Sequence, residues 1–184
     1  RIRILVIGGS QGAKVLNELV PTAVAKMTDI DIRHQTGSVM RETVEQAYRA
    51  LGVKAEVVAF IDNIAAAYQW ADLVVCRSGA MTVSELAAVG LPAILIPFPY
   101  AIDDHQTRNA EHLVAAGAAM LMPEAQLSAT GLREQVESLL ADRARLQDMA
   151  RAARQCAHPL ATTQIADVCR CYLGLPPQLE EAAA

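Results

Sequence analysis

The stretch RILVIGGSQGA, residues 3–13, decides the fold of this 184-residue chain. Its first half is a short apolar run rich in β-branched residues, which is typical of a strand buried in a parallel sheet. Glycines follow at once, and residues 13–27 then place apolar side chains at helical spacing. A strand, a glycine turn and a helix in this order predict the opening unit of a doubly wound α/β domain.

The alternation of strand and helix continues along the chain. Further strands are expected at 30–35, 55–60, 73–76, 93–96 and 119–122. Helices are expected at 39–51, 63–70, 82–89 and 105–116, and from 128 onward with a turn near His158. Pro21 predicts a kink or a restart in the first helix. The pattern predicts one α/β domain with a doubly wound parallel six-stranded Rossmann-like sheet, which binds ligands beyond the carboxyl ends of its strands.

Composition narrows the class of protein. The chain is 53% hydrophobic and 20% charged, with 16 Lys and Arg against 20 Asp and Glu, a formal net charge of −4. It can bury a sizeable core, and its charge argues against nucleic acid as a partner. The most apolar stretch, 87–102, is cut by three prolines and is shorter than the roughly 20 residues of a membrane-spanning helix. The four cysteines of the whole chain form no CxxC pair, which favours reduced thiols over a zinc site.

The glycine turn after the first strand suits a phosphate group. Glycines let the backbone approach a ligand, and the helix that follows directs unpaired N–H groups toward it. A turn that only packs the helix on the sheet is the alternative. The pattern departs from GxGxxG at Ser10, and the second strand ends in Arg33, His34 and Gln35 without the acid that holds a dinucleotide ribose. Both observations disfavour NAD.

A second turn, CRSGAMTVSE at residues 76–85, also leads into a helix. We expect the amides of Ala80, Met81 and Thr82 to be free to bind an anion. Glu85 follows Thr82 by three residues, and this spacing favours a capping box with Thr82 as the cap. A carboxylate that accepts hydrogen bonds from sugar hydroxyls is the alternative.

Two more strand ends carry polar or aromatic groups. After the fifth strand, Asp103 or Asp104 is expected to cap a helix rather than to bind a metal, with His105 and Gln106 in its first turn. After the third strand, Phe60 and Ile61 could hold a flat base, although a strand end followed by a helix cap at Asp62 or Asn63 is favoured in isolation.

Together these segments resemble the MurG family of bacterial N-acetylglucosaminyltransferases. The resemblance is carried by GGSQG, by the long block FIDNIAAAYQWADLVVCRSGAMTVSELAAVGLPAILIPFPYAIDDHQTRNA and by GAA before the sixth strand, and it runs from about residue 4 to 173. It implies a GT-B enzyme of two Rossmann-like domains. This chain would be the donor-binding C-terminal half, residues 1–173, followed by a flexible tail at 174–184. The opening residue is Arg1 rather than Met, so we expect the acceptor-binding and membrane-facing half to be missing.

The resemblance also implies a donor site. Its residues would be Ser10, Gln11, Phe60, Ile61, Ala80, Met81, Thr82, Val83, Ser84, Glu85, His105 and Gln106. The two glycine-containing turns would hold the diphosphate, and the Ile61 backbone would contact uracil. Glu85 would accept from the ribose hydroxyls, while Gln106 and His105 would contact GlcNAc. The general base would lie in the missing half.

The implied reaction is inverting transfer of GlcNAc from UDP-GlcNAc to the muramyl 4-hydroxyl of lipid I, which gives lipid II for peptidoglycan. No metal or cofactor is expected. The implied location is the cytoplasmic side of the bacterial inner membrane, with cell-wall and division proteins as further partners. This chain alone is expected to bind the donor without catalysis. The alternatives are a UDP-GlcNAc 2-epimerase half, a donor-binding module that needs a separate partner chain and, least favoured, a dehydrogenase.

Overall fold

A computed structural model describes residues 1–9 and 12–177, and it contains the parallel sheet that the sequence predicts. The strands are β1 (Ile2–Ile7), β2 (Ile30–Gln35), β3 (Ala55–Val58), β4 (Leu73–Cys76), β5 (Ala93–Leu95) and β6 (Ala119–Leu121). All neighbouring pairs are parallel, in the order β3-β2-β1-β4-β5-β6. The direction of winding therefore reverses between β1 and β4, the place where such sheets bind ligands.

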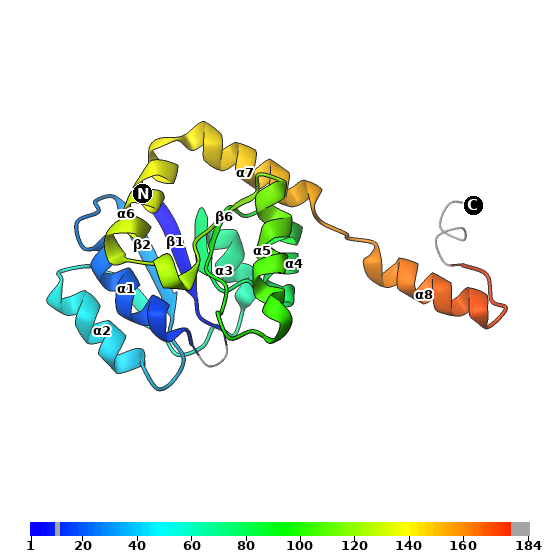
Figure 1. The fold of residues 1–184 in the computed structure, drawn as a ribbon, viewed down its shortest axis with the longest axis horizontal. Helices are drawn as coiled ribbons and strands as arrows, with labels where there is room; N and C mark the ends of the chain where they lie inside the picture. The colour runs from blue at the N-terminus through cyan, green and yellow to red at the C-terminus, as the bar shows by residue number, and fades with distance from the viewer. Residues whose placement is uncertain (10–11, 178–184) are drawn as a thin grey trace.

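Helices cover both faces of this sheet (Figure 1). They are α1 (Lys14–Val24), α2 (Arg41–Ala50), α3 (Ile64–Trp70), α4 (Ala80–Val89), α5 (His105–Ala115), α6 (Ala129–Ala141), α7 (Arg143–Gln155) and α8 (Ala161–Tyr172), with 3-10 turns η1 (Ile102–Asp104) and η2 (Glu124–Gln126). Helices α1, α2 and α6 lie on one face, and α3, α4 and α5 lie on the other. The doubly wound α/β class is confirmed.

Two apolar clusters form the core, one on each face. Ile4 and Val6 of β1 point into the cluster beneath α1, α2 and α6, while Leu5 and Ile7 point into the other. All four side chains are buried. Helix α7 contributes to both clusters. Because burial of each large apolar side chain contributes about 1.5–3 kcal/mol, the continuous apolar run of β1 is explained by this two-sided packing.

Several predicted boundaries change. Helix α1 contains Pro21 within one continuous span and ends at Val24, so it does not restart. Strand β3 lies at the sheet edge, and its pairing with β2 stops at Val58, two residues before the predicted end. The predicted helical region from 128 consists of α6, α7 and α8. Asp142 separates the first two because its side chain accepts from the Arg145 amide and starts a new helix.

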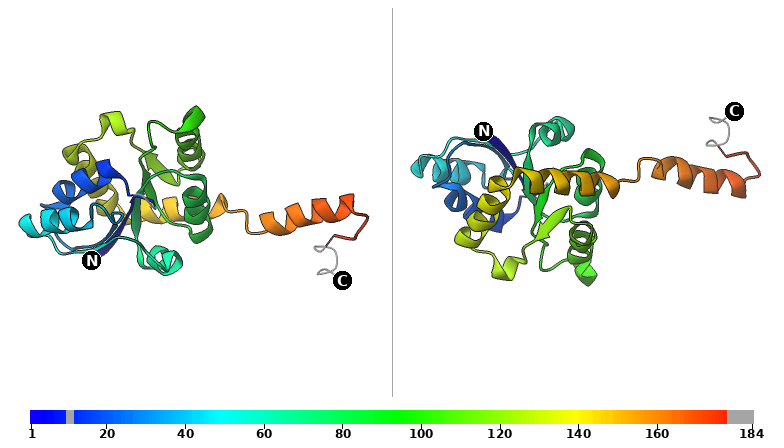
Figure 2. Two further views of the ribbon diagram at one scale, coloured as in Figure 1. Left: turned by 90° about the horizontal axis from the view of Figure 1, so that it is seen from below. Right: turned by 90° about the horizontal axis from the view of Figure 1, so that it is seen from above.

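The last helix stands away from the rest of the molecule, as both views in Figure 2 show. A turn at 158–160 precedes it, where the sequence predicts one. Its large apolar side chains Ile165, Val168 and Tyr172 are exposed. No helix in the part of the chain that the structure describes is long and apolar enough to cross a membrane. Residues 178–184 of the predicted tail lie outside the described residues.

Candidate functional site at the carboxyl ends of the strands

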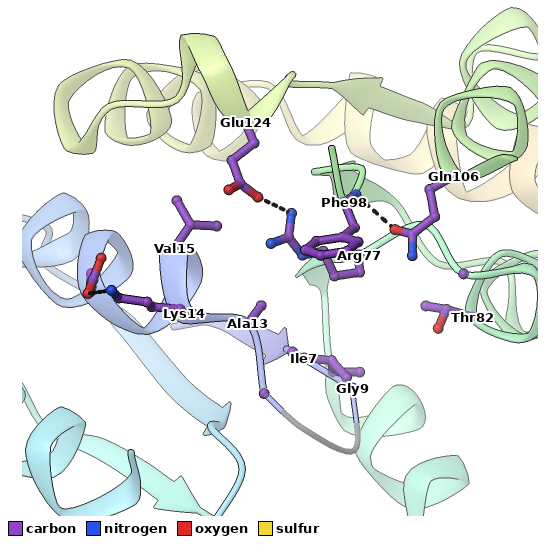
Figure 3. Close-up of a pocket in the computed structure, with 14 residues that line it drawn as sticks. Ile7, Gly9, Ala13, Lys14, Val15, Arg77, Thr82, Phe98, Gln106 and Glu124 are labelled. Carbon is purple, nitrogen blue, oxygen red and sulfur yellow. Dashed lines mark hydrogen bonds and ion pairs between the residues drawn. The ribbon is translucent and has the colours of Figure 1, made fainter. Parts of the chain in front are cut away.

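A cavity of about 740 Å³ opens between the turns that follow β1 and β4 (Figure 3). Its walls come from the glycine turn and start of α1, from the turn before α4, and from Phe98, Gln106 and Glu124. The volume lies within the roughly 300–1,000 Å³ of small-molecule sites. Its position matches the reversal point of the sheet, so this is the candidate ligand site.

The turn after β1 admits only glycine at two positions. A Cβ on Gly8 would lie 2.3 Å from the Ala13 amide nitrogen, and one on Gly12 would lie 2.0 Å from the Thr36 carbonyl oxygen. Gly12 also has a φ of +75°. Its amide donates to the Gly9 carbonyl at 2.9 Å and closes the turn. The predicted contacts Ser10 and Gln11 lie outside the described residues, between these glycines.

The turn after β4 is held by side chains instead. Ser78 is buried, and its hydroxyl donates to the Gln106 carbonyl at 2.8 Å. The Asn109 side chain donates to the Ser78 carbonyl at 3.1 Å, so α5 is tied to this turn at two points. The Gln106 side chain lines the cavity and accepts from the Phe98 amide at 3.0 Å. Sequence reasoning selected Gln106 but missed Ser78 and Asn109.

Helix α4 begins at Ala80, two residues before the predicted start, with Gly79 at the N-cap position. The capping-box interpretation of Thr82 and Glu85 is therefore wrong. The first helical bond runs from the Val83 amide to the Gly79 carbonyl, and the three preceding amides have no place in the helical ladder. The Thr82 side chain reaches the cavity wall.

The other side chains of this turn point elsewhere. Ala80, Met81 and Ser84 are exposed, with Met81 at 74%, and Val83 is buried in the core. Any ligand contact by Val83 would therefore use its backbone.

Glu85 is fixed by the neighbouring helix α3. Its Oε2 accepts a hydrogen bond of 2.8 Å from the Tyr68 hydroxyl, and it does not line the cavity. Burial and then this bond raise the pKa of Tyr68, so the hydroxyl keeps its proton and remains a donor. The arrangement holds a carboxylate in one orientation on the second turn of α4.

Arg77 and Glu124 form a charged wall that sequence reasoning missed. The Arg77 guanidinium donates to the carbonyls of Ile96 at 3.2 Å and Pro97 at 3.0 Å, and it lies 5.3 Å from the centroid of the Phe98 ring. Its ion pair with Glu124 measures 2.5 Å, as Figure 3 shows. The position of Arg77 directly after β4 could have marked it as a site residue. Glu124 lies in the 3-10 turn after β6, where no sequence motif points to a site.

The loop after β3 lies away from the cavity lining. Phe60 is 62% exposed, and Ile61 is half-buried against the core. Asn63 rather than Asp62 caps α3, because its side chain accepts from the Ala66 amide at 3.0 Å. The cavity thus brings together Thr82 and Gln106, while Phe60 and Ile61 are not among the residues that line it.

At the start of α5, Asp104 takes the N-cap position, but its carboxylate accepts from the Thr107 hydroxyl at 2.6 Å instead of a backbone amide. The expected side-chain cap is therefore absent there, because Asp104 has a φ of +51°, outside the extended region usual for an N-cap. His105 is exposed. Among residues 1–9 and 12–177, no three Asp, Glu, His or Cys side chains are grouped to hold a metal ion.

The fold and the two helix starts at one cavity define a Rossmann-like domain with the anion-directed turns of nucleotide-binding folds. The chain belongs to glycosyltransferase family 28, because the model of the Glycosyltransferase family 28 C-terminal domain matches residues 3–165.

Relatives and solved structures agree with this assignment. The chain is 50% identical over 172 residues to the UDP-N-acetylglucosamine--N-acetylmuramyl-(pentapeptide) pyrophosphoryl-undecaprenol N-acetylglucosamine transferase of Marinobacter nauticus, covering 92% of this chain and 47% of the relative. It matches the crystal structure of Acinetobacter baumannii MurG with a TM-score of 0.85 and 39% identity, over 91% of this chain and 51% of that one.

A structure assigned as a UDP-N-acetylglucosamine 2-epimerase from Listeria monocytogenes shares the fold, with a TM-score of 0.70 and 14% identity over 95% of this chain and 46% of that one. The chain spans about half the length of the curated relatives it matches.

Proposed function

We propose that this chain is the donor-binding domain of an inverting transferase that moves GlcNAc from UDP-GlcNAc to lipid I. The proposal is supported by family 28 membership, by the 50% identity to the N-acetylglucosamine transferase of Marinobacter nauticus, and by the geometry of the cavity. The observation that carries it is the meeting of two helix starts, at Lys14 and Ala80, at the reversal point of the sheet.

This geometry suits the departure of a nucleoside diphosphate. In the proposed reaction the acceptor oxygen attacks the anomeric carbon from the face opposite the leaving group. The bond from that carbon to the β-phosphate oxygen breaks, and the acceptor proton passes to a base outside this chain. Negative charge then grows on the diphosphate. Unpaired amides at the starts of α1 and α4 would stabilise that charge, as positioned donors do for developing anions.

The remaining donor contacts follow the surface beside the cavity. Ser10 and Gln11 would meet the diphosphate from the turn after β1. The Ile61 backbone, with Phe60 beside it, would hold uracil. Glu85 would accept from the ribose hydroxyls, and Gln106 with His105 would contact GlcNAc. The bond from Tyr68 to Glu85 supports the ribose role because it fixes the carboxylate on α4, one turn beyond the amides that would meet the phosphates.

The direct test is titration calorimetry of the chain with UDP-GlcNAc, UDP-galactose and NAD. We expect UDP-GlcNAc to bind most tightly, with weak absolute affinity because this chain would supply only one side of the proposed cleft. Preferential binding of NAD, or no binding of UDP-GlcNAc at saturating concentration, would refute the proposal. A 2-epimerase would instead yield a product from UDP-GlcNAc without any lipid acceptor.

Glu85→Ala sharpens the test. Loss of a charge-assisted hydrogen bond to the donor should weaken UDP-GlcNAc binding by about 1.5–3 kcal/mol. The substitution also leaves the Tyr68 hydroxyl without its acceptor, so we expect the free energy of unfolding to fall by about 1–3 kcal/mol. Tyr68→Phe is the matched control, because it removes the same protein hydrogen bond but keeps the carboxylate. If both variants lose stability equally and neither loses affinity, Glu85 has only a packing role.

The proposed partners extend beyond this chain. The other half of the transferase would bind the acceptor lipid I and supply the catalytic base. The transferase would lie on the cytoplasmic face of the inner membrane. Cell-wall and division proteins would be further partners. An assay with separately prepared halves tests this division of labour: the chain alone should bind donor but transfer nothing, and transfer should require the other half.

A further inference from the structure

The buried side-chain amide of one residue connects two turns. In the proposed function, one of these turns binds the diphosphate of the nucleotide and the other binds its uracil. Gln35, the last residue of β2, is only 3% exposed. Its Nε2 donates to the Gly9 carbonyl at 2.8 Å and to the Ala59 carbonyl at 3.1 Å. The first carbonyl belongs to the turn after β1 and the second to the loop after β3, on either side of β2 in the sheet.

Both accepting carbonyls are fixed by a second donor. The Gly9 carbonyl also accepts from the Gly12 amide at 2.9 Å, and the Ala59 carbonyl accepts from the Gly37 amide at 3.1 Å. The first of these bonds closes the turn after β1, and the second ties the loop after β3 to the residues that follow β2. Gln35 adds a direct link between the two segments. A buried amide nitrogen has two hydrogens, and both find an acceptor here, which makes the geometry of one turn dependent on the other.

The residue after Gln35 supports the same turn. The Thr36 carbonyl lies against the backbone of Gly12, so closely that a Cβ there would stand 2.0 Å away. That carbonyl accepts from the buried Asn17 side chain at 2.9 Å, which holds it against α1. The glycine turn thus rests on a rigid base at the end of β2. Movement of the loop at Ala59 would reach this base through Gln35.

We infer that Gln35 is a positioning residue that couples uracil binding at the loop after β3 to diphosphate binding at the turn after β1. This inference rests on the proposed function. Gln35 lies behind both turns and is buried, so it acts on the ligand through Gly9 and Ala59. A nucleoside that orders one turn then prepares the other, and a ligand that spans both gains more than either fragment.

Gln35→Met tests the coupling, because it keeps the length of the side chain and removes both donors. The ligands are UDP, which spans both turns, and uridine, which would reach the loop after β3 and Glu85 but not the turn after β1. We expect UDP affinity to fall roughly 10–30-fold, which lies within the usual range of coupling between two sites, and uridine affinity to fall threefold at most. Tyr48→Phe is the control. It removes another buried hydrogen bond to β2, from Tyr48 to His34, and should leave UDP affinity within about twofold.

A second measurement needs no variant. Uridine added to the unaltered chain should slow hydrogen exchange at the Gly12 amide, on the turn that uridine does not touch. Unchanged exchange there, equal losses of UDP and uridine affinity, or undiminished UDP affinity in Gln35→Met would each overturn the coupling. Failure of the unaltered chain to bind UDP would instead overturn the proposed function.

Discussion

The turns after β1 and β4 face the same cavity, yet they are built by opposite means. The turn after β1 takes its shape from residues without side chains: Gly8 and Gly12 leave no room for a Cβ. The turn after β4 takes its shape from side chains, because Ser78 and Asn109 bind it to α5. Its own Gly79 has space, since the nearest atom to an added Cβ, the Thr82 hydroxyl oxygen, is 3.9 Å away.

The contrast teaches how each turn can be damaged. A turn shaped by close backbone contact fails when atoms are added, whereas a turn shaped by polar side chains fails when atoms are removed. Both place amides at a helix start, so the same chemistry is reached through different sequence requirements.

Adding one methyl group to the turn after β1 should have the largest effect. In Gly12→Ala the new Cβ would overlap the Thr36 carbonyl, and the φ of +75° is strained for alanine. Steric overlap and backbone strain together should lower the free energy of unfolding by about 3–5 kcal/mol. Urea denaturation of the purified variant measures this. A loss below about 1 kcal/mol would show that the turn can open without cost and would end the contrast with the turn after β4.

Acid should have the second largest effect, through His34 on β2, the strand whose end contacts the turn after β1. His34 is buried beside Tyr48, and burial lowers its pKa from the ordinary value of 6.5 to about 3. The unfolded chain therefore binds a proton that the folded chain excludes between these two pH values. The contribution of His34 to the free energy of unfolding is fully present above pH 6.5. It falls by about 1.4 kcal/mol for each pH unit below that value, which amounts to roughly 2 kcal/mol at pH 5.

Denaturation at pH 7.5 and pH 5.0 measures that loss, and His34→Gln is the control. The variant lacks the titrating ring, so it should lose markedly less stability between the two pH values. The exposed histidines His105, His112 and His158 remain in both proteins. Identical losses in the two proteins would assign the acid sensitivity to other groups.

The sequence predicted those strands and turns whose structure depends on neighbouring residues in the chain. Strands β2 and β4 have the predicted bounds because each is a short apolar or alternating run within the sheet. The glycine turn was predicted because only glycine fits its geometry. The Thr82 cap was wrong: the spacing of a capping box is present, but Gly79 already starts the helix.

The polar contacts around the site were beyond sequence reasoning because they join distant residues. The hydroxyl of Tyr68 reaches Glu85, 17 positions along the chain, and Ser78 reaches the Gln106 carbonyl, 28 positions along. Neither pair leaves a periodic or compositional signal. The role of Gln35 was hidden in the same way, since the end of β2 was informative only for lacking the acid of a dinucleotide site.

Removing one hydroxyl should damage the turn after β4. Ser78→Ala leaves the Gln106 carbonyl without this buried donor, and such a loss costs about 1–3 kcal/mol. UDP-GlcNAc affinity should fall as well, because the start of α5 carries Gln106. Thr107→Ala is the matched control: it removes an exposed hydroxyl bond to Asp104 and should change stability by at most about 0.5 kcal/mol. Equal effects of the two substitutions would show that burial of Ser78 has no energetic role.

The smallest expected effect completes the contrast between the turns. Gly79 has a φ of −62° and a ψ of 149°, a conformation that alanine adopts without strain, and an added methyl group meets nothing closer than 3.9 Å. Gly79→Ala should restrict the unfolded chain and thereby add about 0.4–1 kcal/mol, while a less favourable N-cap residue subtracts a similar amount. The net change in the free energy of unfolding should stay within about 0.5 kcal/mol.

Gly12→Ala, the same chemical change at the other turn, should cost several times more. If urea denaturation gives equal losses for the two variants, both turns depend on the absence of a side chain for folding, and the contrast between them fails. Unchanged stability with reduced UDP-GlcNAc affinity would instead show that the space beside Gly79 serves close approach of the diphosphate to the start of α4.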